Sequence, residues 1–351
     1  MVHYQQIRKA GFITFMSLTL LATAGCGIFS KQAAQEIDPP PAESQGGTSA
    51  IDDGQAMQQG EGSQMTVYLK DRNNYIAPVT LQVAVDENRK AEQLALEMMV
   101  DSSEYANQLP EGFQAILPKG TQVKGFNYVK DQKLAIVDLS ASFTDYSLQD
   151  ERRIVEAITW TLTGFPDIER VVLWNEGEKL REMPVDGFPL DEPLTRKIGI
   201  NLEKADGVDF SRSMPVTLYF SSVTPDDLQY YVPVTRLVDR SEDVAKTAMQ
   251  QLIAGPLHHS SLTGVMTPDI EVRSIAIEDD IVTVDLLDDS HQAGQKTPAE
   301  MIQAVILSIT ENTGTDKVQI QMNGQTDVTD TNNRAYDQPV NRPDYVNPLK
   351  L

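Results

Sequence analysis

The stretch Leu134-Ala135-Ile136-Val137-Asp138-Leu139 recurs 147 residues later as Ile281-Val282-Thr283-Val284-Asp285-Leu286. The same offset continues without a gap through two further blocks. It aligns Ile154, Ala157, Ile158 and Leu162 with Met301, Ala304, Val305 and Ile309, and Val171, Leu173 and Gly177 with Val318, Ile320 and Gly324. Three blocks in register are more than chance supplies, so the chain contains an internal duplication.

The duplication extends upstream with a shift that a loop insertion explains. Thr66-Val67-Tyr68-Leu69 matches Thr217-Leu218-Tyr219-Phe220, and Pro78-Val79-Thr80 matches Pro233-Val234-Thr235. The insertion falls at 221–227 of the second copy, and loops absorb insertions at little cost. We therefore predict a first domain at 64–202 and a second at 214–351, joined by a short polar connection at 203–209.

Hydrophobic spacing predicts the elements of each copy. Apolar residues at i, i+3, i+4, i+7 and i+8 from Ala91 and from Ala245 predict a helix whose apolar stripe covers a sheet. Alternating apolar and polar residues over 121–138 and 272–285 predict antiparallel hairpins. The order strand, strand, helix, strand, strand, helix, strand predicts an α+β fold. Each copy should be a two-layer sandwich of a mixed or antiparallel sheet with its two helices on one face.

Capping signals predict the helix ends in the second copy. Ser241 is expected to cap the first helix, and Gly255-Pro256 to end it. Thr297-Pro298-Ala299-Glu300 has the sequence of a capping box and predicts the start of the second helix, with Thr297 as the cap.

Charge and composition limit the classes of partner. Of the 351 residues, 51 are acidic and 29 basic, which gives a net charge of −22. This balance disfavours nucleic acid and anionic lipid surfaces, because both are bound through clustered Lys and Arg. The 40% hydrophobic content is enough for cores. The single cysteine, Cys26, excludes a disulfide framework and a zinc site built on several thiolates.

The N-terminal 25 residues have the layout of a signal peptide. Arg8 and Lys9 precede an apolar stretch at 11–24, which is shorter than the roughly 20 residues that a spanning helix needs. The small residues before Cys26 resemble the lipobox of bacterial lipoproteins, although Thr23 stands where leucine is commoner. We expect 1–25 to be removed and Cys26 to carry lipid. The alternatives are an ordinary secretory signal with an incidental cysteine and, less supported, a catalytic thiol.

The residues after Cys26 have the composition of a flexible tether. Gly, Pro, Ser and Gln supply 19 of the 37 residues at 27–63, without hydrophobic periodicity. Such a segment cannot bury enough apolar surface to offset its ordering entropy. We expect 26–63 to be a lipidated N-terminus and disordered tether with a root-mean-square span of about 35 Å.

Motifs of catalysis and of metal or cofactor binding are not evident in the sequence. It has no Gly-x-Ser-x-Gly elbow, Walker loop or Gly-x-Gly-x-x-Gly turn. His258, His259 and His291 fall in polar loops without metal-ligand spacing, and the acidic run at 279–289 lacks the spacing of a calcium loop. We expect solvated loop residues there, and predict no catalytic residue, cofactor or bound metal.

Four further residues leave two interpretations open. Asp138 and its counterpart Asp285 could form a duplicated site, but short acidic side chains at a strand end more often cap the loop that follows by accepting backbone N–H bonds. Trp160 and Trp174 could mark a partner surface, and core packing is at least as well supported for Trp160.

The order of these features along the chain resembles that of the GerM family of sporulation and spore-germination lipoproteins. The resemblance rests on the lipobox cysteine, the polar tether and a tandem module. In each module, Val-Asp-Leu closes a hairpin strand, an apolar helix follows about 15 residues later, and Val-x-Ile/Leu and a glycine come next. Each copy resembles one GerMN domain, and the resemblance covers about 64–351.

The resemblance implies a non-enzymatic lipoprotein of an endospore-forming bacterium. Such a protein would be held in the outer forespore membrane and face the space between the two membranes around the forespore. It would act with the envelope proteins of the channel-like assembly that joins mother cell and forespore. GerMN domains are similar in fold to the ring-building modules of secretion-type complexes, which is compatible with a homo-oligomer. No catalytic residues come with the family.

Three classes of function remain to be weighed. Tandem modules without site chemistry favour a lipid-anchored scaffold that recruits or stabilises envelope proteins. A ligand-binding lipoprotein would hold a small molecule or a cell-wall fragment in a cleft between the two repeats. A cell-wall hydrolase would need paired carboxylates in a groove.

Overall fold

The computed structural model describes residues 63–84, 89–292 and 294–349. The predicted signal peptide 1–25, Cys26 and all of the predicted tether except its last residue lie outside these ranges. Both copies of the duplicated sequence, called repeat one and repeat two from here on, belong to one compact unit.

Repeat one has the predicted order of strands and helices, with short additions. Its elements are β1 (Ser63–Asp71), β2 (Ile76–Val83), α1 (Ala91–Met98), β3 (Phe113–Gln114), β4 (Val123–Val129), β5 (Leu134–Leu139), α2 (Glu151–Leu162), β6 (Arg170–Asn175) and β7 (Glu178–Lys179).

Repeat two follows the same order after the connecting strand β8 (Glu203–Lys204). Its elements are β9 (Ser213–Val223), β10 (Gln229–Asp239), α3 (Val244–Ala254), β11 (Glu271–Glu278), β12 (Ile281–Leu287), α4 (Ala299–Thr313), β13 (Lys317–Met322) and β14 (Val340–Asn341).

The strands of each repeat are divided between two sheets. In repeat one, β2-β1-β3 form one sheet and β4-β5-β6-β7 the other, which is mixed because β5 and β6 run parallel. Repeat two has the corresponding sheets β8-β10-β9 and β11-β12-β13-β14, with β12 and β13 parallel. We expected a single sheet in each repeat. The α+β class, the tandem duplication and the mixed sheet are confirmed.

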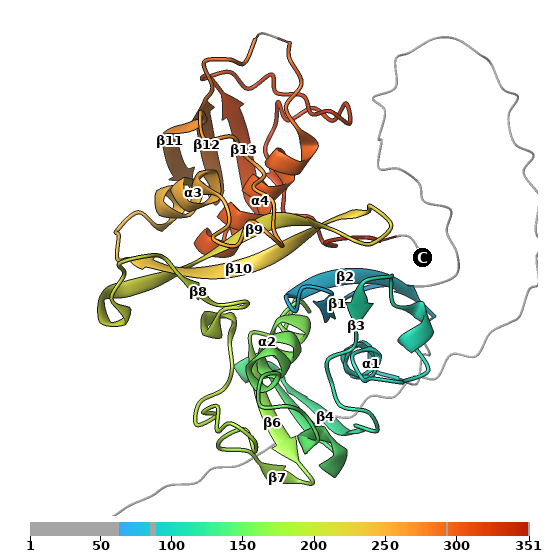
Figure 1. Ribbon diagram of the computed structural model, residues 1–351. Coiled ribbons are helices and arrows are strands. Elements are labelled where there is room, and N and C mark those ends of the chain that lie inside the picture. Colours follow the sequence, from blue (N-terminus) through green and yellow to red (C-terminus); the bar gives the residue numbers. More distant parts are fainter. Residues whose placement is uncertain (1–62, 85–88, 293, 350–351) are drawn as a thin grey trace, which may run out of the picture. The chain divides into compact units, whose positions relative to one another are not determined.

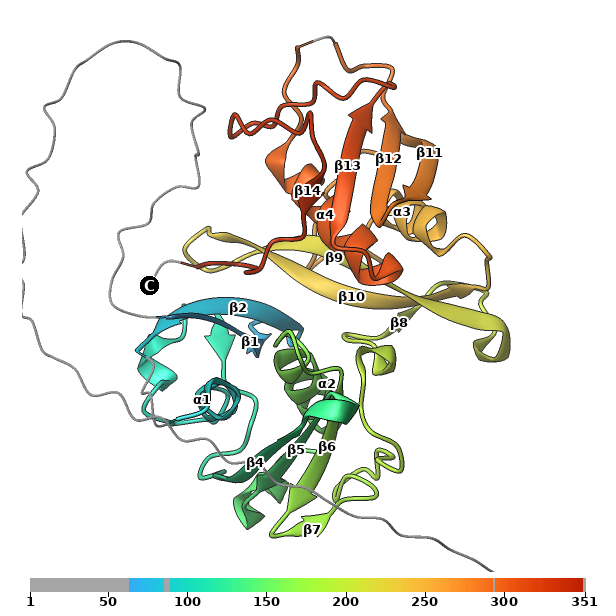
Figure 2. The ribbon, with the colours of Figure 1, turned by 180° about the vertical axis from the view of Figure 1, so that it is seen from behind.

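The helices lie between the two sheets of each repeat, and this position explains the division. In repeat one, α1 contacts both β1 and β4, while α2 contacts β1, β2 and β6 (Figure 1). In repeat two, α3 contacts β9 and β11, and α4 contacts β9 and β13 (Figure 2). Both helices therefore cover one face of the mixed sheet, as predicted, and the hairpin forms a further layer on their other side.

The buried positions repeat with the duplication. Val137, Ile158 and Val171 of repeat one are completely buried, and so, to within 1% exposure, are their counterparts Val284, Val305 and Val318. Burial of each such side chain contributes about 1.5–3 kcal/mol. The sequence blocks that reveal the duplication thus contain the side chains that pack helix against sheet in the two cores.

The predicted start of α3 is wrong by two residues. The carboxylate of Asp243, rather than the hydroxyl of Ser241, accepts the backbone N–H of Lys246 at 2.9 Å. The predicted end of this helix is confirmed, since Gly255 follows it with φ 82°. Glycine adopts this conformation without the steric cost that a Cβ would bring.

The predicted capping box of α4 is also wrong. Thr297 bonds through its backbone to Thr329 (2.9 Å) and Thr331 (3.0 Å), and none of the described groups bonds its buried hydroxyl. The hydroxyl of Thr331 instead accepts the N–H of Ala299 at 3.1 Å. Pairing with a distant segment therefore replaces the local cap.

Candidate functional site

The junction between the repeats is built around two asparagines. The hairpins meet through β2 and β10. The amide nitrogen of Asn201 donates to the carbonyl oxygens of Ile76 and Pro233, both at 2.7 Å, and its amide oxygen accepts the N–H of Ile76 at 2.8 Å. One side chain thus joins both hairpins.

Asn347 makes the same contacts with the roles of the repeats exchanged. It donates to the carbonyl oxygens of Tyr231 and Pro78 and accepts the N–H of Tyr231, all at 2.8 Å. Tyr231 is the counterpart of Ile76, and Pro78 the counterpart of Pro233. Both asparagines have positive φ, which asparagine tolerates better than most residues. The junction therefore has local two-fold pseudo-symmetry.

The segment that ends each repeat crosses to the other repeat's hairpin. β8, which follows repeat one, pairs in parallel with β10 at Arg236 and Leu237. Pro348, near the end of repeat two, forms a parallel bridge with Thr80 of β2. Pulling the repeats apart would break the sheet pairing at both places.

A buried carboxylate at the junction binds two arginines. Glu311 of α4 accepts two bonds from Arg196 Nη1, at 3.0 and 2.9 Å, and one from Arg342 Nη2 at 2.7 Å. The hydroxyl of Tyr219 donates to the same carboxylate at 3.2 Å. The arginines are counterparts, because each stands five residues before its junction asparagine. Glu311 has Gly164 as its counterpart, so one carboxylate serves both arginines.

Aromatic rings complete the surroundings of the arginines. The guanidinium of Arg196 lies 4.5 Å from the ring centre of Trp160, and that of Arg342 lies 5.6 Å from the ring centre of Tyr219. Trp160 is fully buried and donates its indole N–H to the carbonyl of Gly199 at 2.9 Å. The core interpretation of Trp160 is therefore confirmed. Trp174 is half-buried in β6, and its indole N–H has no partner among the described groups.

Charge at the junction depends on pH through Glu311. Burial alone would raise the pKa of this carboxyl, but the guanidinium groups of Arg196 and Arg342 hold its pKa below the usual range. A carboxyl whose pKa is lowered by folding stabilises the folded state fully above its unfolded pKa, about 4.3 for glutamate. This stabilisation is lost as the pH falls through the lower, folded-state pKa.

We expect acid to weaken the junction in a way that Glu311 determines. The free energy of unfolding should fall as the pH is lowered from about 5 through the unfolded-state pKa of about 4.3 and below it, and Glu311→Gln should show a shallower fall because residue 311 no longer titrates. Denaturant titrations of both proteins across this range measure the difference. Glu151, whose pKa is also lowered, is present in both proteins and cancels. Parallel pH profiles would contradict this assignment.

The duplicated aspartates are turn caps. Asp138 accepts the backbone N–H of Gly177 at 3.0 Å, and Asp285 accepts that of Gly324 at 2.9 Å. Each glycine lies just beyond the parallel neighbouring strand and has φ near 80°. The capping interpretation is confirmed, although the turn follows the neighbouring strand rather than the strand of the aspartate.

The loop histidines and the acidic run do not converge. His258 and His259 are exposed, and His291 is half-buried. Asp285 is buried and lies 3.7 Å from Arg273, while Asp288 accepts the N–H of Ser290 at 2.8 Å. Within 63–84, 89–292 and 294–349, three or more His, Cys, Asp or Glu side chains nowhere come together in a way that could hold a metal ion. In the same ranges no helix is both long and apolar enough to cross a membrane.

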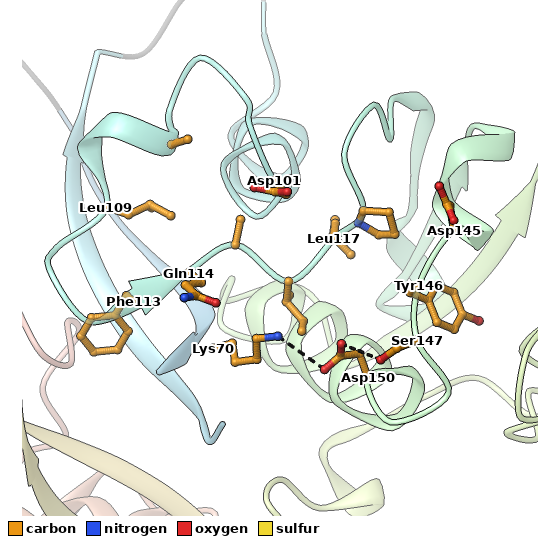
Figure 3. A pocket seen from close by; sticks show the side chains of 14 residues that line it. Lys70, Asp101, Leu109, Phe113, Gln114, Leu117, Asp145, Tyr146, Ser147 and Asp150 are labelled. Carbon is orange, nitrogen blue, oxygen red and sulfur yellow. Dashed lines mark hydrogen bonds and ion pairs between the residues drawn. The ribbon is translucent and has the colours of Figure 1, made fainter. Parts of the chain in front are cut away.

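A pocket of about 540 Å³ lies in repeat one. In Figure 3, the side chains of Lys70 and Ser147 both reach Asp150, at 3.5 and 2.9 Å, while Asp101 and Asp145 come from separate loops. The pocket is lined by Lys70, Asp101, Ala106, Leu109, Phe113, Gln114, Ala115, Ile116, Leu117, Pro118, Asp145, Tyr146, Ser147 and Asp150.

Sequence reasoning missed most of the junction and all of the pocket. Arg196 and Asn201 lie 146 residues before Arg342 and Asn347, so the duplication itself carried a signal for both pairs. Glu311 had no such signal because its counterpart is a glycine. The pocket residues come from four separate segments, which no local spacing connects.

The fold and junction define a class of protein in which two duplicated α+β domains are fused through a pseudo-symmetric polar contact. The family profile described as "Germane: Sporulation and spore germination" matches residues 66–181 and 217–328. The chain belongs to this family. The family description names a developmental process rather than a catalysed reaction.

Similarity to one relative, in sequence and in structure, extends this result over most of the chain. The spore germination protein GerM of Bacillus subtilis (strain 168) is 34% identical over 350 residues, which span 93% of this chain and 94% of that protein. The solved tandem GerMN domains of the B. subtilis sporulation protein GerM match with a TM-score of 0.76 and 34% identity, over 82% of this chain and 99% of the solved chain. The resemblance to the GerM family is confirmed, and a GerM-like role in sporulation and germination is supported.

Proposed function

We propose that this chain is a non-enzymatic scaffold, anchored by lipid on Cys26, that recruits or stabilises the channel-like complex between mother cell and forespore. The observation that carries the proposal is the match to GerM over nearly the whole chain, with both domains in tandem. The proposed location is the outer forespore membrane, with the two repeats in the space between the membranes.

The junction supports a scaffold better than a ligand site between the repeats. Glu311, Arg196, Arg342 and both junction asparagines are bonded to one another or to backbone groups. Polar groups satisfied in this way hold two domains in a fixed arrangement and offer little to a ligand entering between them. A scaffold needs such a fixed arrangement to present both domains together.

Deletion and complementation test the proposal in the spore-forming host. We expect deletion of the gene to reduce the yield of heat-resistant or germinating spores and to disperse a fluorescently tagged channel protein. Wild-type protein should restore both. Cys26→Ser should restore neither, because the chain is no longer held at the membrane. Normal sporulation, germination and channel localisation in the deletion strain would overturn the proposal.

Two further experiments address partner and activity. A pull-down of the lipidated protein from sporulating cells should recover envelope proteins of the channel assembly. Asp191→Asn, a change at an exposed loop of repeat one, should recover the same proteins and serves as the control. Purified protein that cleared peptidoglycan would instead establish a hydrolase.

A further inference from the structure

The pocket of repeat one combines an apolar floor with an acidic rim. Ala106, Leu109 and Ala115 line the pocket and are half-buried, so their side chains offer apolar surface above the buried Phe113 and Leu117. Asp101 follows α1 and Asp145 precedes α2, and both carboxylates are exposed at the pocket (Figure 3). Apolar surface and charge are therefore available to the same ligand.

The charges that line the pocket leave a negative excess. The one lining cation, Lys70, pairs with Asp150, and Arg153 lies 3.6 Å from the same carboxylate. Asp101 and Asp145 form no ion pair with any residue in the described ranges. An anionic ligand would meet these two carboxylates, whereas a cationic ligand would be attracted by them.

The polar groups of the pocket are not required by the fold. In repeat two the counterparts of Lys70 and Asp150 are Ser221 and Thr297, which are 7% and 2% exposed. Repeat two forms the same helices and sheets without the ion pair. The ion pair of Lys70 and Asp150 is thus a property of repeat one, beyond what the shared architecture needs.

We propose that this pocket binds a lysine- or arginine-bearing peptide segment of a partner protein. Basic side chains of the segment would interact with Asp101 and Asp145, which lie apart in Figure 3, and their alkyl stems would lie on the apolar surface of the pocket, as long basic side chains do elsewhere. The volume is within the usual range of roughly 300–1,000 Å³ for ligand sites. Leu109, which lines the pocket and is half-buried, adds apolar surface that an apolar side chain of a peptide can cover and a small polyamine cannot.

This inference deepens the proposed scaffold function, since it names the chemistry of a partner segment. Its test is separate because it uses purified protein and synthetic peptides. A failure to bind would leave the deletion phenotype and membrane anchoring unaffected, and a normal deletion phenotype would leave the binding constant unaffected.

Fluorescence anisotropy on the full mature chain in detergent micelles measures the interaction. The probe is a fluorescein-labelled heptapeptide of alternating leucine and lysine, compared with versions that carry glutamine or glutamate in place of lysine. We expect the lysine peptide to bind with a Kd on the order of 100 μM, and the other two at least about tenfold more weakly. Affinity should fall with added salt, because partly exposed charges are screened.

Substitutions in the rim locate the binding. Asp101→Asn and Asp145→Asn should each weaken the lysine peptide about threefold, and together about tenfold, as partly exposed charge pairs do. Asp191→Asn lies outside the pocket and should have no effect. Circular dichroism confirms that each variant is folded. Equal binding of the glutamine peptide, or an unchanged Kd in the folded double variant, would overturn the proposal. Tighter binding of spermine than of the peptide would overturn the assignment to a protein segment.

Discussion

Replacing Glu311 with alanine is expected to lower the free energy of unfolding by about 3 kcal/mol. The change leaves Arg196 and Arg342 without their shared carboxylate, and an arginine that loses its partner in a largely buried site typically costs about 3–5 kcal/mol. We choose the lower end because the two arginine side chains are 29% and 20% exposed and retain some contact with water. Guanidinium denaturation followed by circular dichroism measures the change.

Two matched variants separate the junction from a general effect of losing an acid. Glu178→Ala removes an exposed carboxylate from β7, and its unfolding free energy should stay within about 0.5 kcal/mol of wild type. Glu311→Gln keeps the size and one hydrogen-bond acceptor, and should therefore lose less than alanine. A loss below about 1 kcal/mol for Glu311→Ala would mean that the cluster acts as an ordinary surface ion pair.

Trp160→Ala is expected to destabilise the protein by about 3–5 kcal/mol, as removal of a buried tryptophan usually does. The ring is fully buried, lies 5.8 Å from the ring centre of Tyr68 and carries the guanidinium of Arg196 above it. Its loss would create a cavity in the core of repeat one and remove one wall of the junction. Denaturant unfolding at pH 7 measures the effect.

Repeat two supplies the control for this tryptophan. Its counterpart is Leu307, which is completely buried, so Trp160→Leu reproduces a side chain that the fold already accommodates. We expect Trp160→Leu to lose clearly less than alanine, because leucine fills part of the cavity. Equal losses for leucine and alanine would show that the indole hydrogen bond to Gly199, rather than cavity volume, dominates.

The elements of the fold could be predicted because hydrophobic periodicity is local. The stripe that begins at Ala91 and the Val-Asp-Leu strand ends each record one face of one element. The division into two sheets could not be predicted in this way, since it depends on which strands pair after the helices have packed. Thr297 failed as a cap for the same reason, because distant backbone at 329–331 bonds its own backbone groups.

The predictions about single residues also failed where an interaction joins distant parts of the chain. Asp138 and Asp285 were correctly interpreted as caps of backbone N–H groups, but the groups that they bind, those of Gly177 and Gly324, are 39 residues away rather than in the loop that follows. Glu311 could not be found from spacing, since its partners Arg196 and Arg342 are 115 and 31 residues away. Cys26 lies outside the described residues, and lipidation there stays a prediction.

The crossing of the end segments bears on how such a chain could have arisen. The segment that ends each repeat pairs with the hairpin of the other repeat. Two identical subunits that exchange their tails have the same arrangement. A symmetric pair of repeat one would bring two copies of Arg196 together with Gly164 where a carboxylate is needed, and a symmetric pair of repeat two would bring two copies of Glu311 together. One carboxylate between two arginines requires unequal halves. A single chain allows the two halves to differ at this position, where repeat two has Glu311 and repeat one has Gly164.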